Sequence, residues 1–239
     1  NRDANSSIEY GMKAKACVGK TSYKYFYVTE RIIGSLGVTM NLPLIDTLIT
    51  DLKQIISENT DLKAYQLLIY SSQMTYDFRS NNFEKAIING QKLFVDNKKF
   101  KLLLSHELFD KYVLVGRAYA ALRNYDEAIN WMNKGFEQIK DKKNVRTLGN
   151  FYVNLAVLYK QKGNYELAIE NKYKIQSEIL QYLAGLQENT AYKKLIQNGL
   201  DLLEFDIAWK TSKGNTNDET RIPIPKDKMN KARFVRSVL

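Results

Sequence analysis

Two stretches of the chain repeat one residue pattern without gaps, 40 positions apart. Residues 115–129 align with residues 155–169, and position 116 is glycine where position 156 is alanine. A repeat of about 40 residues indicates one structural unit stacked several times, because such a unit cannot bury its apolar face alone. The identical pairs are Tyr119 with Tyr159, Asn124 with Asn164, Tyr125 with Tyr165, Ala128 with Ala168 and Ile129 with Ile169.

A weaker copy precedes these two. Residues 82–87 align with residues 124–129 at an offset of 42. The stretch before it departs from the pattern, since Met74 stands where the small residue should be and Tyr76 is one position out of phase.

The pattern resembles the tetratricopeptide repeat family, in which a small residue is followed three positions later by Tyr and then by Gly-x-Tyr-x-x-Ala. The matching residues are Gly116, Tyr119, Tyr125 and Ala128, then Ala156, Tyr159, Gly163, Tyr165 and Ala168. The resemblance is specific over residues 109–182 and weaker over 65–98. It implies helix pairs in which Gly116 and Ala128 permit close approach and the tyrosines fill the seams. The spacing exceeds the family's usual length of about 34 residues, so we expect longer helices or loops near residues 96–104 and 138–147.

Apolar periodicity and turn signals then predict an all-α fold. We expect one domain over residues 1–239, a right-handed α-α superhelix of about five helix pairs, with clearest repeats at 65–98, 109–142 and 149–182. Residues 22–39 and 44–58 would form a degenerate pair with Gly34 or Gly37 at its close contact. The predicted helices are 5–18, 22–39, 44–58, 61–79, 83–96, 102–122, 125–140, 146–162, 165–185, 189–212 and 226–238, with a loop at 211–225.

Composition excludes several classes of protein. The chain has 1 Cys, 1 His and 3 Pro, so it can form neither an internal disulfide nor a zinc site of Cys and His ligands. The sequence holds no apolar run of the roughly 18 residues that a bilayer crossing needs. Because the first residue is Asn1, we expect the chain to begin after a processing site or to be excised from a longer protein.

The few candidates for chemistry do not combine into a site. His106 could act as a base with Ser105 or Asp110, but sequence neighbours do not make a triad. Cys17 lies among small apolar residues and is expected to be buried. Residues 19–21 end like a phosphate-binding loop without its first glycine or preceding strand. We therefore predict no enzyme activity, no metal and no cofactor.

The net charge of +10 has a local origin. The last 14 residues carry five basic side chains against Asp227, which gives 5 − 1 = +4. We expect the helix at 226–239 to cap the array, as stacked repeats require, and an anionic membrane or a partner is the alternative. Nucleic acid is disfavoured because acidic residues are interspersed through residues 1–210 and no binding motif occurs.

The resemblance also implies a concave groove, lined by the first helix of each pair, that binds a peptide or protein segment. Two positions that hold Lys and Asn in carboxylate-binding relatives are Val113 and Arg117 here, then Val153 and Val157, so that clamp is not reproduced. The mixture of apolar side chains with the basic Arg79, Arg117 and Lys160 at the groove positions suits an extended or helical segment with acidic residues. The groove positions are Ser71, Thr75, Phe78, Arg79, Asp110, Val113, Arg117, Ala120 and Ala121, then Asn150, Val153, Val157, Lys160 and Gln161.

These features favour a non-catalytic interaction module, and more finely the sensing region of a bacterial signalling or transcription regulator. One alternative is an envelope scaffold lipoprotein, which predicts a lipidated Cys before Asn1. A second is a cytoplasmic peptide-responsive regulator, which predicts an upstream DNA-binding domain. An extracytoplasmic location is favoured over a cytoplasmic one, and the oligomeric state is left open.

Overall fold

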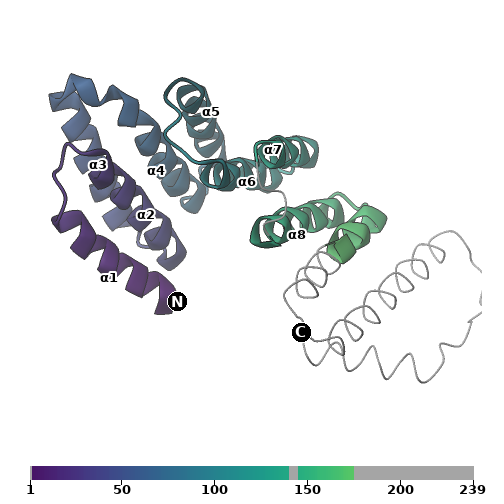
Figure 1. Ribbon diagram of the computed structural model, residues 1–239. Coiled ribbons are helices and arrows are strands. Elements are labelled where there is room, and N and C mark those ends of the chain that lie inside the picture. Colours follow the sequence, from purple (N-terminus) through teal and green to yellow (C-terminus); the bar gives the residue numbers. More distant parts are fainter. Residues whose placement is uncertain (1, 140–144, 175–239) are drawn as a thin grey trace, which may run out of the picture. The chain divides into compact units, whose positions relative to one another are not determined.

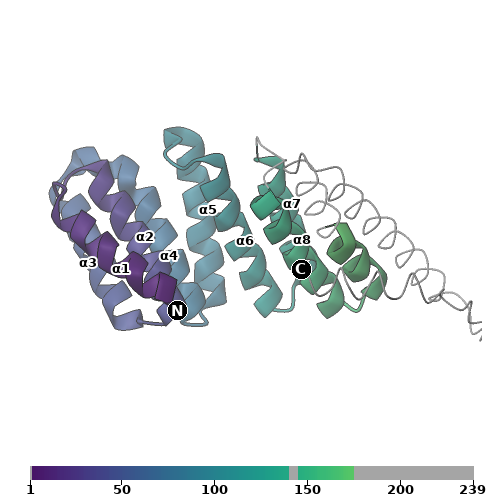
Figure 2. The same ribbon diagram turned by 60° about the horizontal axis from the view of Figure 1, so that its bottom comes forward.

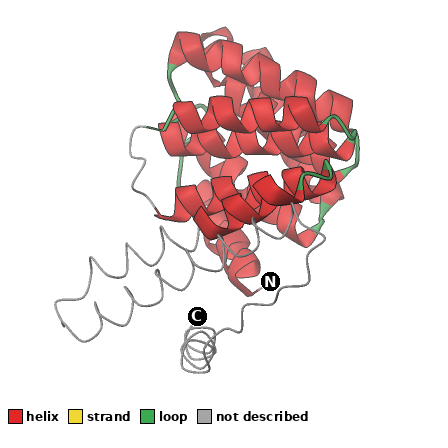
Figure 3. Ribbon diagram, turned by 90° about the vertical axis from the view of Figure 1, so that its right-hand side faces the viewer, coloured by secondary structure: helices red, strands yellow, loops and turns green. Residues whose placement is uncertain are grey.

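The computed structural model describes residues 2–139 and 145–174, and each regular element in these ranges is a helix (Figure 3). The predicted elements beyond residue 174, among them the loop at 211–225 and the helix at 226–239, lie outside the described residues. Residues 165–174 are helical where the description ends. The elements are α1 (Arg2–Ala16), α2 (Tyr23–Thr39), α3 (Leu42–Glu58), the 3-10 helix η1 (Thr60–Tyr65), α4 (Gln66–Arg79), α5 (Phe83–Phe100), α6 (Ser105–Ala121), α7 (Tyr125–Glu137) and α8 (Val145–Gln161).

The chain divides into two compact units, Asn1–Ile139 and Lys140–Leu239. The division falls inside residues 138–147, where the long repeat spacing predicts extra residues. The other predicted place, 96–104, is where α5 runs on to Phe100 before a short link to α6. That all 239 residues act as one domain stays a prediction.

Within the first unit, α4 with α5 and α6 with α7 form antiparallel pairs, and consecutive helices lie side by side (Figures 1 and 2). The first helices of the pairs also touch, α2 with α4 and α4 with α6. The helix α1 packs against α2. The all-α, repeat-like fold predicted from the sequence is confirmed.

The turn inside each pair has the same backbone geometry in all three copies. Asn81, Arg123 and Gly163 occupy it with φ of 60°, 60° and 84°. The next residue is always Asn, and its N–H donates to the carbonyl five residues earlier, at 2.8, 2.9 and 2.8 Å. This is the left-handed helix ending that glycine favours. The shared geometry confirms the three predicted turns, including the two in which the sequence lacks glycine.

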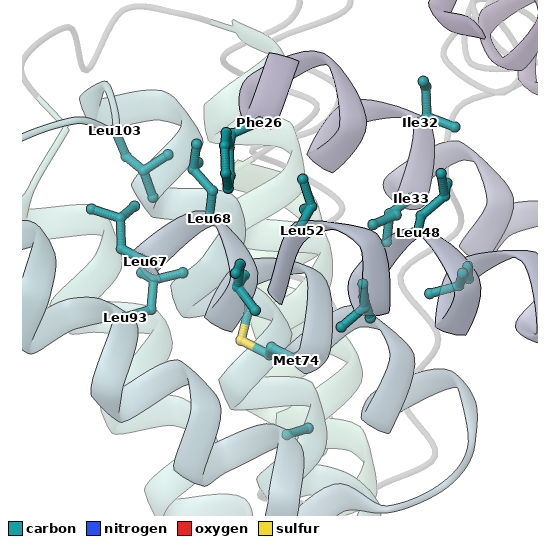
Figure 4. Packing of buried hydrophobic residues seen from close by; sticks show 14 of the residues in the cluster. Phe26, Ile32, Ile33, Leu48, Leu52, Leu67, Leu68, Met74, Leu93 and Leu103 are labelled. Carbon is teal, nitrogen blue, oxygen red and sulfur yellow. The ribbon is translucent and has the colours of Figure 1, made fainter. Parts of the chain in front are cut away.

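The core of the first unit joins side chains from helices far apart in the sequence (Figure 4). Phe26 from α2, Leu52 from α3, and Leu67 and Met74 from α4 have no exposed surface, and neither has Leu93 from α5. Each such side chain stabilises the fold by about 1.5–3 kcal/mol relative to an exposed position. The residues of this hydrophobic cluster all belong to the first unit.

The pairs α4–α5 and α6–α7 each place a methionine of one helix against a glycine of the other, in opposite order. Met74 in α4 lies against Gly90 in α5, where an added Cβ would come 3.1 Å from the Met74 sulfur. In the next pair the glycine is on the first helix, and a Cβ at Gly116 would lie 2.9 Å from Cγ of Met132. Gly116 and Met132 lie 42 positions after Met74 and Gly90. Met74 therefore departs from the repeat pattern because the small residue of its pair is Gly90, on the second helix.

The glycines of α2 lie elsewhere than predicted. A Cβ at Gly37 would come 3.1 Å from Cγ2 of Thr75 in α4, so its close contact is with the next first helix rather than with α3. A Cβ at Gly34 would meet nothing within 4 Å. The expected contact inside the 22–39 and 44–58 pair is therefore wrong, because Gly37 packs against the neighbouring repeat and Gly34 is exposed.

Candidate interaction surface

The helices α2, α4 and α6 present one continuous face, which we call the first-helix face. A buried carboxylate joins all three. The Ser71 hydroxyl in α4 donates to Oε1 of Glu30 at 2.6 Å, and Nζ of Lys111 in α6 donates to the same oxygen at 2.5 Å. Glu30 is only 5% exposed, so its charge is balanced by an ion pair inside the protein.

Burial alone would raise the pKa of Glu30, since water no longer solvates the charge. The Lys111 ammonium and the hydrogen bonds from Lys111 and Ser71 outweigh burial, so the pKa lies below its ordinary value. Glu30 is accordingly ionised at neutral pH and holds the three helices in register.

Two further contacts connect α2 with α6 beside this ion pair. The Tyr27 hydroxyl donates to Oε1 of Glu107 at 2.6 Å, and the Tyr23 hydroxyl donates to the carbonyl of Leu102 at 3.2 Å. The hydrogen bond to Glu107, together with burial, raises the pKa of Tyr27 to about 12. These contacts close one end of the first-helix face, which we call the bridged end: Tyr23, Tyr27, Glu30, Ser71, Leu102, Glu107 and Lys111.

The other end of the face has no such bridges, and arginines gather there. The Arg117 guanidinium lies 5.3 Å from the centre of the Phe78 ring. Arg79 reaches the surface beside Gly37, where an added Cβ would lie 3.4 Å from its Nε. We call this the arginine end: Gly34, Gly37, Thr75, Phe78, Arg79 and Arg117.

The two arginines repel each other. Partial removal of water lowers the pKa of the Arg117 guanidinium, and the charge of Arg79 lowers it further. Although Arg117 as a residue is exposed, its charged group is packed against the ring. Among the described residues, neither arginine forms an ion pair with a carboxylate. The arginine end therefore carries positive charge that the described residues leave unbalanced.

The structure separates the predicted groove residues of the first unit into two sets. Thr75, Phe78, Arg79 and Arg117 come together at the arginine end. Ser71 and Val113 do not line a surface, because Ser71 has no exposed area and Val113 only 5%. The Ser71 hydroxyl donates its hydrogen bond to the buried Glu30, and Val113 packs in the interior.

Asp110 is exposed on α6 and has an interaction partner. In the second unit, five predicted groove residues are exposed on α8, namely Asn150, Val153, Val157, Lys160 and Gln161. Val153 and Val157 are 51% and 49% exposed, one helical turn apart. They form an apolar strip on that unit.

Most repeat positions lie as their pattern predicts. Ala128 is fully buried, and a Cβ at Gly116 would lie 3.0 Å from its carbonyl oxygen. Tyr119 stacks on Trp131 at 6.3 Å. Tyr165 departs from the prediction with 64% exposure. The other positions, Tyr125, Ala156, Tyr159 and Ala168, are partly buried, and Gly163 lies in the turn.

Two candidates for chemistry, His106 and Cys17, lie at exposed positions on different parts of the first unit. His106 is exposed near the start of α6. Cys17 is also exposed, so the prediction of a buried thiol is wrong: α1 ends at Ala16, and Cys17 lies in the turn that follows. Residues 19–21 follow a helix rather than a strand. Within residues 2–139 and 145–174, no three His, Cys, Asp or Glu side chains gather where they could hold a metal ion.

The sequence offered little sign of the bridged end. Glu30 and Lys111 look like ordinary surface charges of amphipathic helices, and they are separated by 81 positions. A usable signal was the spacing of Tyr23, Tyr27 and Glu30, which places three groups with polar tips on one stripe of α2.

Stacked helix pairs with repeated turns and a shared first-helix face define a helical-repeat protein. Residues 112–141 and 149–171 match the model of the tetratricopeptide repeat family, which supports this family for that stretch. No curated protein and no solved structure matches the chain. Tetratricopeptide repeats are in general non-catalytic scaffolds for protein interaction. None of the helices in the described part of the chain has the length and apolar character of a membrane span.

Proposed function

We propose that the chain is a non-catalytic module that binds an acidic protein or peptide segment on its first helices. The observation that carries this proposal is the pair Arg79 and Arg117 beside Phe78, whose charge no described carboxylate balances. Arginine binds carboxylates through two parallel hydrogen bonds, and an aromatic ring beside it adds apolar contact.

The second unit adds a surface of the same kind. Val153 and Val157 offer apolar area on α8, and Lys160 adds a positive charge one turn further along. An extended segment that alternates apolar and acidic side chains would suit either unit.

Peptide capture tests the proposal. Peptides from a displayed random library would be selected on the immobilised full chain, and their affinity measured for the double variant Arg117→Glu, Lys160→Glu. We expect about a tenfold loss or more, as for removal of charge-assisted hydrogen bonds. The double variant Lys63→Glu, Lys98→Glu is the matched control, because both lysines are exposed outside the first helices of the pairs. Undiminished binding by the first variant would defeat the proposal.

A finer part of the proposal is that this module senses a peptide for a bacterial signalling or transcription regulator. Its support is analogy at the level of the fold, together with the Asn-, Lys-, Ile- and Tyr-rich composition. The test is to join the chain to its natural neighbouring domains and add a selected peptide. A change in kinase activity or DNA binding supports the sensing role, and the absence of any such output domain contradicts it.

A further inference from the structure

The bridged end limits where a ligand can lie on the first unit. Tyr23, Tyr27 and Glu30 follow each other along one stripe of α2, and each bonds to a successive part of the chain in or just before α6. The same helical stripe continues through Gly34 and Gly37, and Gly37 packs against Thr75 of α4. The contacts between the two helices stop where the glycines begin.

Gly34 leaves that space open. A Cβ there would meet nothing within 4 Å, whereas the preceding residue of the stripe, Glu30, bonds across to Lys111. An open site of this kind has no packing function, because a larger side chain would fit without displacing the protein's own atoms. The absent side chain leaves this position on α2 open.

The length of the open part sets the size of the ligand. From Glu30 to Thr39 the helix rises by about 13 Å, at roughly 1.5 Å per residue. An extended peptide advances about 3.3 Å per residue, so about four residues span this distance.

We propose that the arginine end binds a short acidic segment of a partner protein, with an Asp or Glu side chain held between Arg79 and Arg117. The neighbouring apolar side chain of that segment fits over Gly34 against Phe78. Charge complementarity identifies the occupant, because two converging guanidinium groups without a carboxylate attract one from outside. This proposal rests on the proposed function and names its ligand.

The test uses the full chain and a library of random peptides with constant flanks on both sides, so that all variable carboxylates are side chains. Peptides selected on the wild-type chain would be measured against Arg79→Glu and Gly34→Leu. We expect an Asp or Glu beside an apolar residue in the selected peptides. Arg79→Glu is expected to weaken their binding about tenfold or more. Gly34→Leu is expected to weaken it as much by filling the space, with no fall in the unfolding temperature.

A change in the peptide separates this contact from a general effect of charge. Replacing its Glu by Gln should cost about tenfold in affinity for the wild-type chain and nothing further for Arg79→Glu. The control Lys63→Glu, Lys98→Glu should bind like the wild type. Selected peptides without acidic residues, or a Gln peptide that binds as well as the Glu peptide, would overturn the proposal.

Failure of this inference is distinguishable from failure of the proposed function. If selected peptides lose affinity for Arg117→Glu, Lys160→Glu but bind Arg79→Glu and Gly34→Leu normally, the module binds peptides, but no carboxylate is held between Arg79 and Arg117. If the selection recovers no peptide, both proposals are contradicted.

Discussion

At the scale of single residues, Gly34 and Gly90 show that glycine can have opposite roles inside two helices. Both lie inside helices. A Cβ at Gly34 meets open space, whereas one at Gly90 would come 2.4 Å from Cγ2 of Val115. The first glycine leaves room for a ligand, and the second lets α5 approach α6.

Substitution by alanine should therefore change stability in opposite directions. Gly34→Ala is expected to stabilise the fold by about 0.5–1 kcal/mol, since alanine favours the helix more than glycine. Gly90→Ala is expected to destabilise it by about 1–3 kcal/mol through overpacking against Val115 and Met74. Urea unfolding of both variants and the wild type measures the two free energies. A stabilising Gly90→Ala would show that the seam is looser than described.

The sequence predicted residue positions well where a repeat recurs and poorly where a residue acts once. Gly116 and Ala128 were found because equivalent small residues stand 40 positions away. Ser71 was assigned to the groove by its repeat position, but Glu30 reaches it from a helix with no equivalent partner in the pattern. Pattern arguments cannot reveal such a contact, because nothing in the local sequence records it.

At the scale of helices, the Glu30 ion pair connects three elements that are not adjacent in the chain. Removing one partner of a buried pair leaves an uncompensated charge, whereas removing both is often nearly neutral. The pair is thus expected to fix the register of α2 against α6 more than to add stability.

A double-mutant cycle tests this expectation. Lys111→Met alone should cost about 3–5 kcal/mol, because Glu30 keeps its charge in the interior. Adding Glu30→Met should restore much of the loss, although the Ser71 hydroxyl then lacks its acceptor. Chemical denaturation of the two single variants and the double variant gives the coupling energy. Simple additivity of the two single losses would contradict a direct interaction.

Helix positions were predictable because each turn carries a local signal. The predicted 22–39 agrees with α2 within one residue, and Ser22 caps it by accepting a hydrogen bond from the Tyr25 N–H. The predicted 61–79 was less accurate, since Thr60–Tyr65 is a 3-10 helix before α4. Periodicity does not separate a tight first turn from an α-helix, because both carry apolar residues at similar spacing.

At the scale of the whole molecule, carboxylates that are buried or partly buried set the response of stability to pH. Burial opposes ionisation of Asp51, but hydrogen bonds from Tyr25 and Lys15 outweigh it, so the pKa of Asp51 is lowered as that of Glu30 is. Asp77 is the opposite case, since burial raises its pKa more than the hydrogen bond from Asn89 lowers it.

The signs of these shifts give a prediction. Glu30 and Asp51 contribute stability above their ordinary pKa values of 4.5 and 3.8, and that stability is lost as the pH falls through their lower native values. Asp77 disfavours the fold once the pH rises above 3.8. Asp77→Asn should therefore stabilise the protein at pH 7 and lose this gain below pH 3.8. Urea midpoints at a series of pH values measure both effects, and a gain for Asp77→Asn that did not depend on pH would contradict the assignment.

The fold class was predictable from repeats alone, whereas the division at residue 139 was not. The repeat continues across the boundary, from residues 115–129 to 155–169. Similar seams on both sides give no local sign of where one compact unit ends, because compactness depends on contacts summed over many residues.

The exchange of methionine and glycine between adjacent seams also bears on how similar repeats avoid confusion during folding. If α6 took the place of α4 against α5, Gly116 and Gly90 would meet and leave a void. If α4 took the place of α6 against α7, Met74 and Met132 would compete for one space. Each wrong partner thus loses packing that the right one keeps. Neighbouring copies of one motif are prone to misassembly, and here a difference in side-chain size marks each helix for its own mate.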